Sequence, residues 1–427
     1  MIFPRDAEAF ARAAERYWPG RAEEVADLLD RGDRTPIEVG PLPPRFRWVD
    51  MPAWTVPGTV DGRLLVPDHL AADGAWTSID WVSVGLWYLD CLAERVHESN
   101  AGPIHSYSIR LRDWDERQWQ RAWVNRIAIA IRAMLARDAQ RDPDAWFGPL
   151  PRPEFDLSHD LDALTKHLSL RLKQTAFSGF NGVRGLLRGR PDRFVKGGGR
   201  ALRFFLGGGD YDLLDEVLDS ESAAGVTSVF HVFPGRPRKR LFDPKYEPGS
   251  PGVAARLRMI AARGCEIGLH PGFDDFEDQD SLARGAEKLA GILGRKPVRI
   301  RQHWLRFTFA GTWRAQEAAG FQVDSTLGFN DRPALRAGAA LRYAPLVGDR
   351  RSESLEEIPL VLMDSHLHDY LDLDGGGILA EADRWIDEII SVGGIASVNW
   401  HQRVLHPDYG WGASWRHVLG TVRVQNR

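Results

Sequence analysis

The sequence predicts an α/β protein with a distorted (β/α)7 barrel over residues 151–427, preceded by a mixed α/β domain over residues 1–150. From residue 155 onward, short apolar runs alternate with helical stretches, as is typical of a parallel sheet that is open or closed into a barrel. We count seven such runs, one fewer than in the eight-stranded barrel. The proline-rich segment 149–153 marks the boundary, because proline stiffens the chain and lacks a backbone donor.

The elements of the second region follow one another in a regular order. The expected strands are 155–159, 227–233, 266–270, 298–303, 322–325, 354–361 and 395–401. The helices expected between them are 163–173, 251–263, 280–293, 312–320 and 378–392. Several of these helices begin near a capping residue or a proline, which supports their boundaries. In the first region, helices are expected near 6–31, 78–98 and 115–137.

The segment 178–210 departs from this order. It contains two runs of three glycines, at 197–199 and 207–209, and seven Lys or Arg residues between Arg184 and Arg203. Glycine runs favour turns and loops, so we expect a mobile, solvated insertion after the first helix. Its positive charge also suits an anionic partner, such as a lipid headgroup or a diphosphate. Peripheral membrane contact through residues 184–203 is therefore a second prediction.

Composition excludes several functional classes. The net charge of -4 gives no global reason to expect a nucleic-acid partner. Only two cysteines occur, Cys91 and Cys265, so neither a disulfide framework nor a thiolate zinc cluster is expected. We found no apolar run long enough to span a bilayer and no signal-peptide core, and the sequence therefore predicts a cytoplasmic protein.

Polar side chains gather where the predicted strands end. Parallel strands bring these ends to one side of a sheet, and barrel enzymes build their active sites there. The first strand ends in two aspartates, which are costly to bury unless they meet a metal ion, a proton or a cation. Aspartates at this position could also cap the following helix. The candidates in chain order are Asp160, Asp162, His270, Asp274, Arg301, Gln302, His303, Asp324, Asp364 and His401.

Taken in order, these residues resemble the polysaccharide deacetylase family, metal-dependent amide hydrolases that include chitin and peptidoglycan deacetylases. The resemblance covers roughly residues 155–405. The family's aspartate pair is matched by Ser158-His159-Asp160-Leu161-Asp162, its arginine by Arg301-Gln302-His303-Trp304, and its final histidine by Val398-Asn399-Trp400-His401. Residues 324–332 are similar to a bacterial branch that carries an extra N-terminal region and often lies near surface-polysaccharide genes.

One position departs from the family's pattern. The family has two metal-ligand histidines separated by three residues, whereas here His270 is followed by Asp274. The resemblance implies a divalent metal ion held by Asp162, His270 and either Asp274 or His303, or else a barrel that has lost its metal. Zn²⁺ is the expected ion, and an additional carboxylate would shift the preference toward Mn²⁺ or Co²⁺.

The resemblance also implies roles for the remaining residues. Asp160 would be the general base, Arg301 would hold it ionised, and His401 would be the general acid. Asp364 or Asp324 would orient His401 or Arg301. The expected reaction removes an acetyl group, N-acetyl or O-acetyl, from a sugar in a glycan or glycan precursor, within surface polysaccharide metabolism. The alternatives are a non-catalytic glycan-binding barrel and a hydrolase of another small amide, such as a ureide or formamide.

Overall fold

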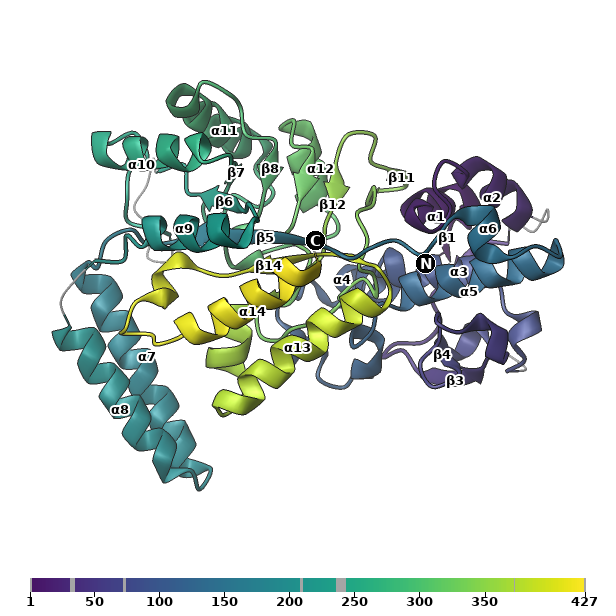
Figure 1. Cartoon of the computed structure of the whole chain (residues 1–427), viewed down its shortest axis with the longest axis horizontal. Helices are drawn as coiled ribbons and strands as arrows, with labels where there is room; N and C mark the ends of the chain where they lie inside the picture. Colours follow the sequence, from purple (N-terminus) through teal and green to yellow (C-terminus); the bar gives the residue numbers. More distant parts are fainter. Residues whose placement is uncertain are drawn as a thin grey trace.

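The computed structural model describes residues 2–30, 35–71, 74–207, 210–235, 243–371 and 373–425 (Figure 1). Its centre is an eight-stranded, curled parallel sheet with the strand order β12-β9-β8-β7-β6-β5-β14-β13. This confirms the predicted α/β class and the parallel sheet. In chain order the strands are β5 (Glu154–Leu161), β6 (Val229–Val232), β7 (Glu266–Leu269), β8 (Arg299–Ile300), β9 (Val323–Asp324), β12 (Glu356–Glu357), β13 (Leu360–Met363) and β14 (Ile395–Asn399).

The two edge strands of this sheet are consecutive in the sequence. Only Ile358 and Pro359 separate β12 from β13. The backbone N–H of Ile358 donates to the carbonyl of Asp324 at 2.9 Å, and that of Ser397 donates to the carbonyl of Pro359 at 2.9 Å. The segment 356–363 therefore forms backbone hydrogen bonds with β9 at one edge of the sheet and with β14 at the other. The ladder is interrupted at Pro359, because proline supplies no N–H donor. If β12 and β13 are counted as one interrupted strand, the sheet has seven strands. The (β/α)7 description itself stays a prediction.

Helices connect the strands, and local sequence explains where they begin and end. In α11, Asp278 caps the first turn by accepting from the N–H of Ser281 at 2.9 Å. Residues 282, 285, 286 and 289 are buried, which is the spacing of one helix face. Gly294 ends the helix in the left-handed conformation that glycine adopts readily. The connecting helices are α9 (Leu214–Ala224), α10 (Pro251–Ala262), α11 (Gln279–Leu293), α12 (Thr312–Ala318) and α13 (Gly375–Ser391), and α14 (Gly412–Gln425) follows the last strand.

Residues 2–150 are mixed α/β. They contain the helices α1 (Ala7–Ala13), α2 (Ala22–Leu29), α3 (Trp81–Leu89), α4 (Leu92–Ala101), α5 (Trp123–Asp138) and α6 (Pro143–Phe147). The strands β1 (Ile2–Phe3) and β2 (Ile37–Glu38) form one antiparallel pair, and β3 (Phe46–Asp50) and β4 (Arg63–Pro67) form another. A further pair, β10 (Leu346–Val347) with β11 (Arg350–Arg351), lies in the second half of the chain.

The first region packs closely against the second. Glu388 on α13 is buried and accepts hydrogen bonds from both Arg126 Nη2, at 2.8 Å, and the backbone N–H of Ala122, at 2.9 Å. The hydroxyl of Tyr17 donates to the carbonyl of Val392 at 2.7 Å. Apolar side chains of both regions belong to one continuous core. The division of the chain into two domains near residue 150 stays a prediction.

The expectation of a loop at 178–210 is wrong for most of that segment. Helices α7 (Leu168–Leu187) and α8 (Pro191–Leu206) form a hairpin that projects from the rest of the chain (Figure 1). A Cβ added to Gly197 would lie 2.8 Å from the Cα of Gly182, so glycine here permits close packing of two helices and does not mark a turn. Gly208 and Gly209 lie outside the described residues. Within the described ranges, no helix combines the length and apolar character that crossing a membrane requires.

Candidate metal centre

The polar strand ends predicted from the sequence line one pocket. The pocket has a volume of about 490 Å³ and is bordered by residues that follow β5, β7, β8 and β14. Neighbouring strands of the sheet run parallel, so their carboxyl ends meet on one side. The predicted residues that line the pocket are Asp160, Asp162, His270, His303 and His401.

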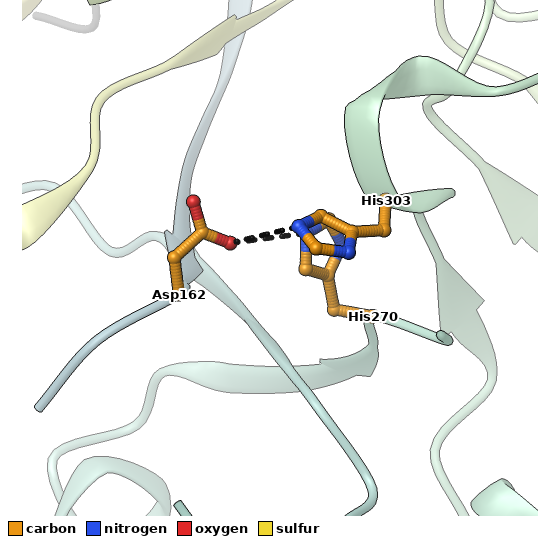
Figure 2. A group of neighbouring side chains, drawn as sticks. All are labelled: Asp162, His270 and His303. Atoms are coloured by element: carbon orange, nitrogen blue, oxygen red, sulfur yellow. Dashed lines mark ion pairs between the residues drawn. The ribbon is translucent and has the colours of Figure 1, made fainter. Parts of the chain in front are cut away.

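Three side chains in this pocket form a group with the composition of a metal site. Asp162 Oδ1 lies 3.5 Å from His270 Nε2 and 3.7 Å from His303 Nε2 (Figure 2). Their candidate ligand atoms all lie within 4.8 Å of one another. Ligand atoms of a tetrahedral zinc ion lie roughly 3.4 Å apart, given bonds of about 2.0–2.2 Å. One carboxylate and two imidazoles would leave the fourth position for water or substrate.

Hydrogen bonds around the group orient its ligand atoms. His270 Nδ1 lies 2.8 Å from the carbonyl oxygen of Arg301, which fixes the proton on Nδ1 and leaves the lone pair of Nε2 facing Asp162. On the other ring, His303 Nδ1 lies 3.7 Å from Asp243 Oδ1. Asp162 Oδ1 is buried, and within the described residues its nearest polar neighbours are the two imidazole nitrogens. A cation at that point would satisfy an oxygen that otherwise accepts no hydrogen bond.

The second oxygen of Asp162 contacts two cationic side chains. Arg403 Nη1 donates to Oδ2 at 2.8 Å, and His401 Nε2 lies 3.4 Å from the same oxygen. Burial alone would raise the pKa of Asp162, but the charge of Arg403 and the contacts with His270 and His401 together outweigh burial and hold the pKa well below the ordinary value. Asp162 is therefore an anion at neutral pH, as a metal ligand must be.

Asp160 is held next to the group by a buried arginine. Arg301 Nη1 donates to Asp160 Oδ1 at 3.2 Å, and Asn399 Nδ2 donates to Oδ2 at 2.9 Å. Burial opposes the charge on Asp160, yet Arg301 and the neighbouring imidazoles of His270 and His231 together hold the pKa well below its ordinary value. His231 Nδ1 lies 3.3 Å from Oδ1, and burial lowers the pKa of His231 to about 3, so that its ring is neutral. Asp160 is consequently ionised and fixed in place.

Arg301 itself is fully buried and has no unused donor. Besides the bond to Asp160, it donates to the hydroxyls of Ser158 at 2.7 Å, Ser325 at 3.0 Å and Ser397 at 2.7 Å. Its Nε donates to the carbonyl of Ser325 at 2.9 Å. These contacts use all five N–H groups of the guanidinium, so its position is determined by strands β5 and β14 and by the loop that follows β9.

His401 is paired with a fully buried aspartate. His401 Nδ1 lies 2.9 Å from Asp364 Oδ1, and the backbone N–H of His401 donates to Asp364 Oδ2 at 2.7 Å. Burial disfavours the imidazolium, but the carboxylates of Asp364 and Asp162 together prevail and raise the pKa of His401 to about 9. His401 is therefore protonated at neutral pH, with Nε2 available as a donor toward the pocket.

Two predicted residues lie away from this arrangement. Asp274 accepts a hydrogen bond from Arg306 Nη1 at 2.6 Å, and it is not part of the three-residue group. Asp324 packs in the interior beside Glu357, where Trp313 Nε1 donates to both carboxyl groups at 3.1 Å. Of the two aspartates considered as orienting groups, Asp364 is the one beside His401.

The sequence interpretation missed three residues that contact the two aspartates. Asn399 lies two residues before His401, and side chains two apart on an extended chain face the same way, so strand periodicity could have found it. Arg403 follows the strand, where no periodicity applies. His231 ends an apolar strand, a context that is typical of a core residue; it is fully buried, and its sequence context gives no sign of its contact with Asp160.

Comparisons with known proteins add little to this geometry. No family model matches the chain, and no curated protein does so. Among solved structures, the chain is similar to one described as "putative polysaccharide deacetylase from Mycobacterium smegmatis". The two share 19% sequence identity, the match covers 64% of this chain and 85% of that chain, and the TM-score is 0.39. A likeness at this level carries no conclusion about function, so membership of the polysaccharide deacetylase family stays a prediction.

Proposed function

We propose that this chain is a metal-dependent hydrolase that removes an acetyl group, most simply an N-acetyl group, from a sugar. One observation carries the proposal: the Asp162, His270 and His303 group shares a pocket with an ionised carboxylate on one side and a protonated imidazole on the other. Metal-assisted hydrolysis of an amide uses these three functions together, namely a Lewis acid, a proton acceptor and a proton donor.

Each function corresponds to side chains of the pocket. A divalent ion held by Asp162, His270 and His303, Zn²⁺ by the character of the ligands, would polarise the acetyl carbonyl and acidify water. Asp160 takes one proton from the attacking water, whose oxygen bonds to the carbonyl carbon. His401 gives a proton to the sugar nitrogen as the C–N bond breaks, releasing acetate and the free amine.

The neighbouring residues set the charges that these steps need. Arg301 keeps Asp160 ionised and immobile, and Asp364 keeps His401 protonated with Nε2 toward the reacting atoms. Arg403 holds Asp162 in its anionic form. Removal of any of these partners changes a protonation state within the site without removing a ligand or a reacting group.

The form of the pocket supports a sugar over a smaller amide. At about 490 Å³ it is within the size range of sites that enclose ligands of drug size, and larger than a ureide or formamide needs. Trp304 borders the pocket, whereas Trp400 is fully buried. An indole ring in the wall of the pocket offers the apolar contact surface that a pyranose ring can use.

The proposal is tested by assaying metal-loaded protein on an N-acetylated amino-sugar oligosaccharide, with acetate and free amine quantified. His401→Ala should lower the rate on this amide by roughly 10²–10⁴-fold, because an amine leaves poorly without a proton. An aryl acetate ester has a better leaving group and should be affected less by the substitution. Equal losses on amide and ester would show that His401 is structural. Metal-loaded protein that releases no acetate from either substrate would contradict the proposal.

A further inference from the structure

The α7–α8 hairpin has an unusual surface. In the described part of the chain, eighteen large hydrophobic side chains are exposed, and twelve of them lie on these two helices. They are Leu168, Leu172, Phe177, Phe180, Val183, Leu186 and Leu187 on α7, and Phe194, Val195, Leu202, Phe205 and Leu206 on α8. Soluble monomers rarely expose a contiguous apolar patch of this kind, and such patches mark docking surfaces.

The apolar residues of α7 form a stripe that faces away from α8. Leu168, Leu172, Phe180, Val183 and Leu187 follow one another at helical spacing, with exposed Ala176 completing the row. The side toward α8 carries small residues instead.

Small side chains bring the two helices close together. An added Cβ at Gly197 would lie 2.8 Å from both the Cα of Gly182 and the carbonyl oxygen of Ser178, and one at Gly185 would lie 2.6 Å from the Cβ of Arg193. A helix pair in water normally buries its large apolar residues, whereas helices in lipid pack through small residues and turn large ones outward. The hairpin has the second pattern.

The charge of the hairpin identifies the partner. Residues 168–206 contain nine Lys or Arg and a single acidic residue, Asp192, although the whole chain has a net charge of -4. A second copy of this hairpin would repel the first, and a nucleic acid would leave the aliphatic side chains without apolar contacts. An anionic bilayer surface satisfies both features, because it offers negative headgroups above an apolar layer.

The hairpin also forms part of the wall of the pocket. The first half of α7 contributes Leu170, Lys173, Gln174 and Phe177 to the lining. Lys173 Nζ lies 5.1 Å from the centre of the Trp304 ring, and Phe177 is 38% exposed while bordering the pocket. A bilayer in contact with α7 would therefore lie next to the pocket.

We propose that the α7–α8 hairpin docks on an anionic membrane surface, with its apolar stripe in the interface, and presents the pocket to a sugar carried on a membrane lipid. The docking is inferred from the hairpin alone, whereas the class of substrate rests on the proposed function. Because no described helix can cross a membrane, the hairpin lies on the bilayer and does not span it.

Co-sedimentation of the full chain with vesicles tests the docking. Vesicles of phosphatidylcholine with phosphatidylglycerol should bind the protein at least tenfold more tightly than vesicles of phosphatidylcholine alone. Replacing Phe180, Leu187, Val195 and Leu202 together by serine should lower binding at least tenfold, since these side chains are exposed and the fold does not need them. Arg184→Glu with Lys196→Glu should lower it on anionic vesicles only.

The matched control replaces exposed apolar residues elsewhere: Val56→Ser with Ile109→Ser, which are 61% and 69% exposed, should leave vesicle binding unchanged. Docking is overturned if the parent protein does not bind anionic vesicles, or if the control variant loses binding as the hairpin variant does. It is also overturned if sedimentation velocity shows a dimer that the four serine substitutions dissociate.

Two activity assays separate this inference from the proposed function. The four-serine variant should deacetylate a soluble N-acetylated sugar at the parent rate, but should lose at least tenfold in kcat/KM on an N-acetylated glycolipid held in anionic vesicles. If the protein binds vesicles but deacetylates no substrate, the result would contradict the proposed function and still support the docking. If the parent and the four-serine variant are equally active on the glycolipid, the proposal that the hairpin presents the pocket to a lipid-borne sugar is overturned.

Discussion

Two pairs of carboxyl groups lie at strands of the same sheet, and their surroundings give them different protonation states. Asp160 and Asp162 at the end of β5 are each bonded to a guanidinium, from Arg301 and Arg403. Both aspartates have pKa values well below the ordinary value in spite of their burial. This pair faces the pocket as two anions.

The second pair joins neighbouring strands. Asp324 on β9 and Glu357 on β12 are partners in the parallel register, and both are fully buried. No Lys or Arg in the described ranges forms an ion pair with either of them; their hydrogen-bond donors are Trp313, Thr326 and the backbone N–H of Leu327. Burial therefore raises the pKa of both groups, and that of Glu357 well above its ordinary value. The direction of these shifts favours a proton on Glu357 at neutral pH.

The difference shows that burial alone does not make a carboxylate pair a site. Carboxyl groups with cationic partners both stay charged and can bind a metal ion, whereas a buried pair without such partners retains a proton and is held as part of the core. The sequence shows both pairs as acidic residues at strand ends. The cations that distinguish them come from segments far away in the chain, as with Arg301 on Asp160 and Arg403 on Asp162.

The largest expected effect separates the two pairs by activity. Asp160→Asn should lower kcat by roughly 10²–10⁴-fold with metal binding retained, because it removes a proton acceptor and leaves the three ligands in place. Glu357→Gln is the matched control, since an amide has the shape of the protonated carboxyl group, and it should keep nearly the parent rate. Comparable rates for Asp160→Asn and Glu357→Gln would show that the charged pair has no special role.

A smaller effect concerns stability. Arg301→Met leaves Asp160 buried without its guanidinium, and it should lower the free energy of unfolding by about 3–5 kcal/mol. Arg342→Met breaks a surface pair with Glu356, in which both side chains are 44% exposed, and should cost about 0–1 kcal/mol. Urea denaturation in the presence of a chelator measures both. Equal losses for the two variants would contradict the view that Arg301 compensates a buried charge.

The smallest effect is a dependence of stability on pH. A carboxyl group whose pKa is raised in the folded state stabilises the fold fully below its unfolded pKa, and this contribution is lost as pH rises through the folded pKa. The parent should therefore lose stability relative to Glu357→Gln as pH rises from about 4.5. A tenfold change in proton affinity corresponds to about 1.4 kcal/mol. Parallel stability curves between pH 4 and pH 8 would show that Glu357 is not protonated by burial.

Apolar runs in the sequence predicted the structure more accurately than glycine runs did. Apolar runs ending in polar residues correctly placed most strands and brought together Asp160, Asp162, His270 and His401. Glycine runs misled the interpretation of residues 178–206, because local composition does not reveal that Gly182 and Gly197 face each other across two helices.

Asp274 shows a second limit of sequence reasoning. Its spacing from His270 matched a family pattern, but spacing does not fix the direction of a side chain in a turn. The chain turns at residues 271–275, and Asp274 pairs with Arg306 outside the group formed by Asp162, His270 and His303. His303 lies beside His270, with ring centroids 4.9 Å apart, because β8 pairs with β7 and the turn His303–Leu305 follows β8 closely.

Metal titration of chelator-stripped protein tests most directly the claim that Asp162, His270 and His303 hold one divalent ion. Calorimetry should show one Zn²⁺ per chain for the parent protein. His303→Ala should weaken binding by more than the 10–100-fold typical of losing a residue that only supports a ligand. Asp274→Ala should bind Zn²⁺ as the parent does. Loss of binding in Asp274→Ala with normal binding in His303→Ala would contradict the account, and so would a parent protein that binds no zinc.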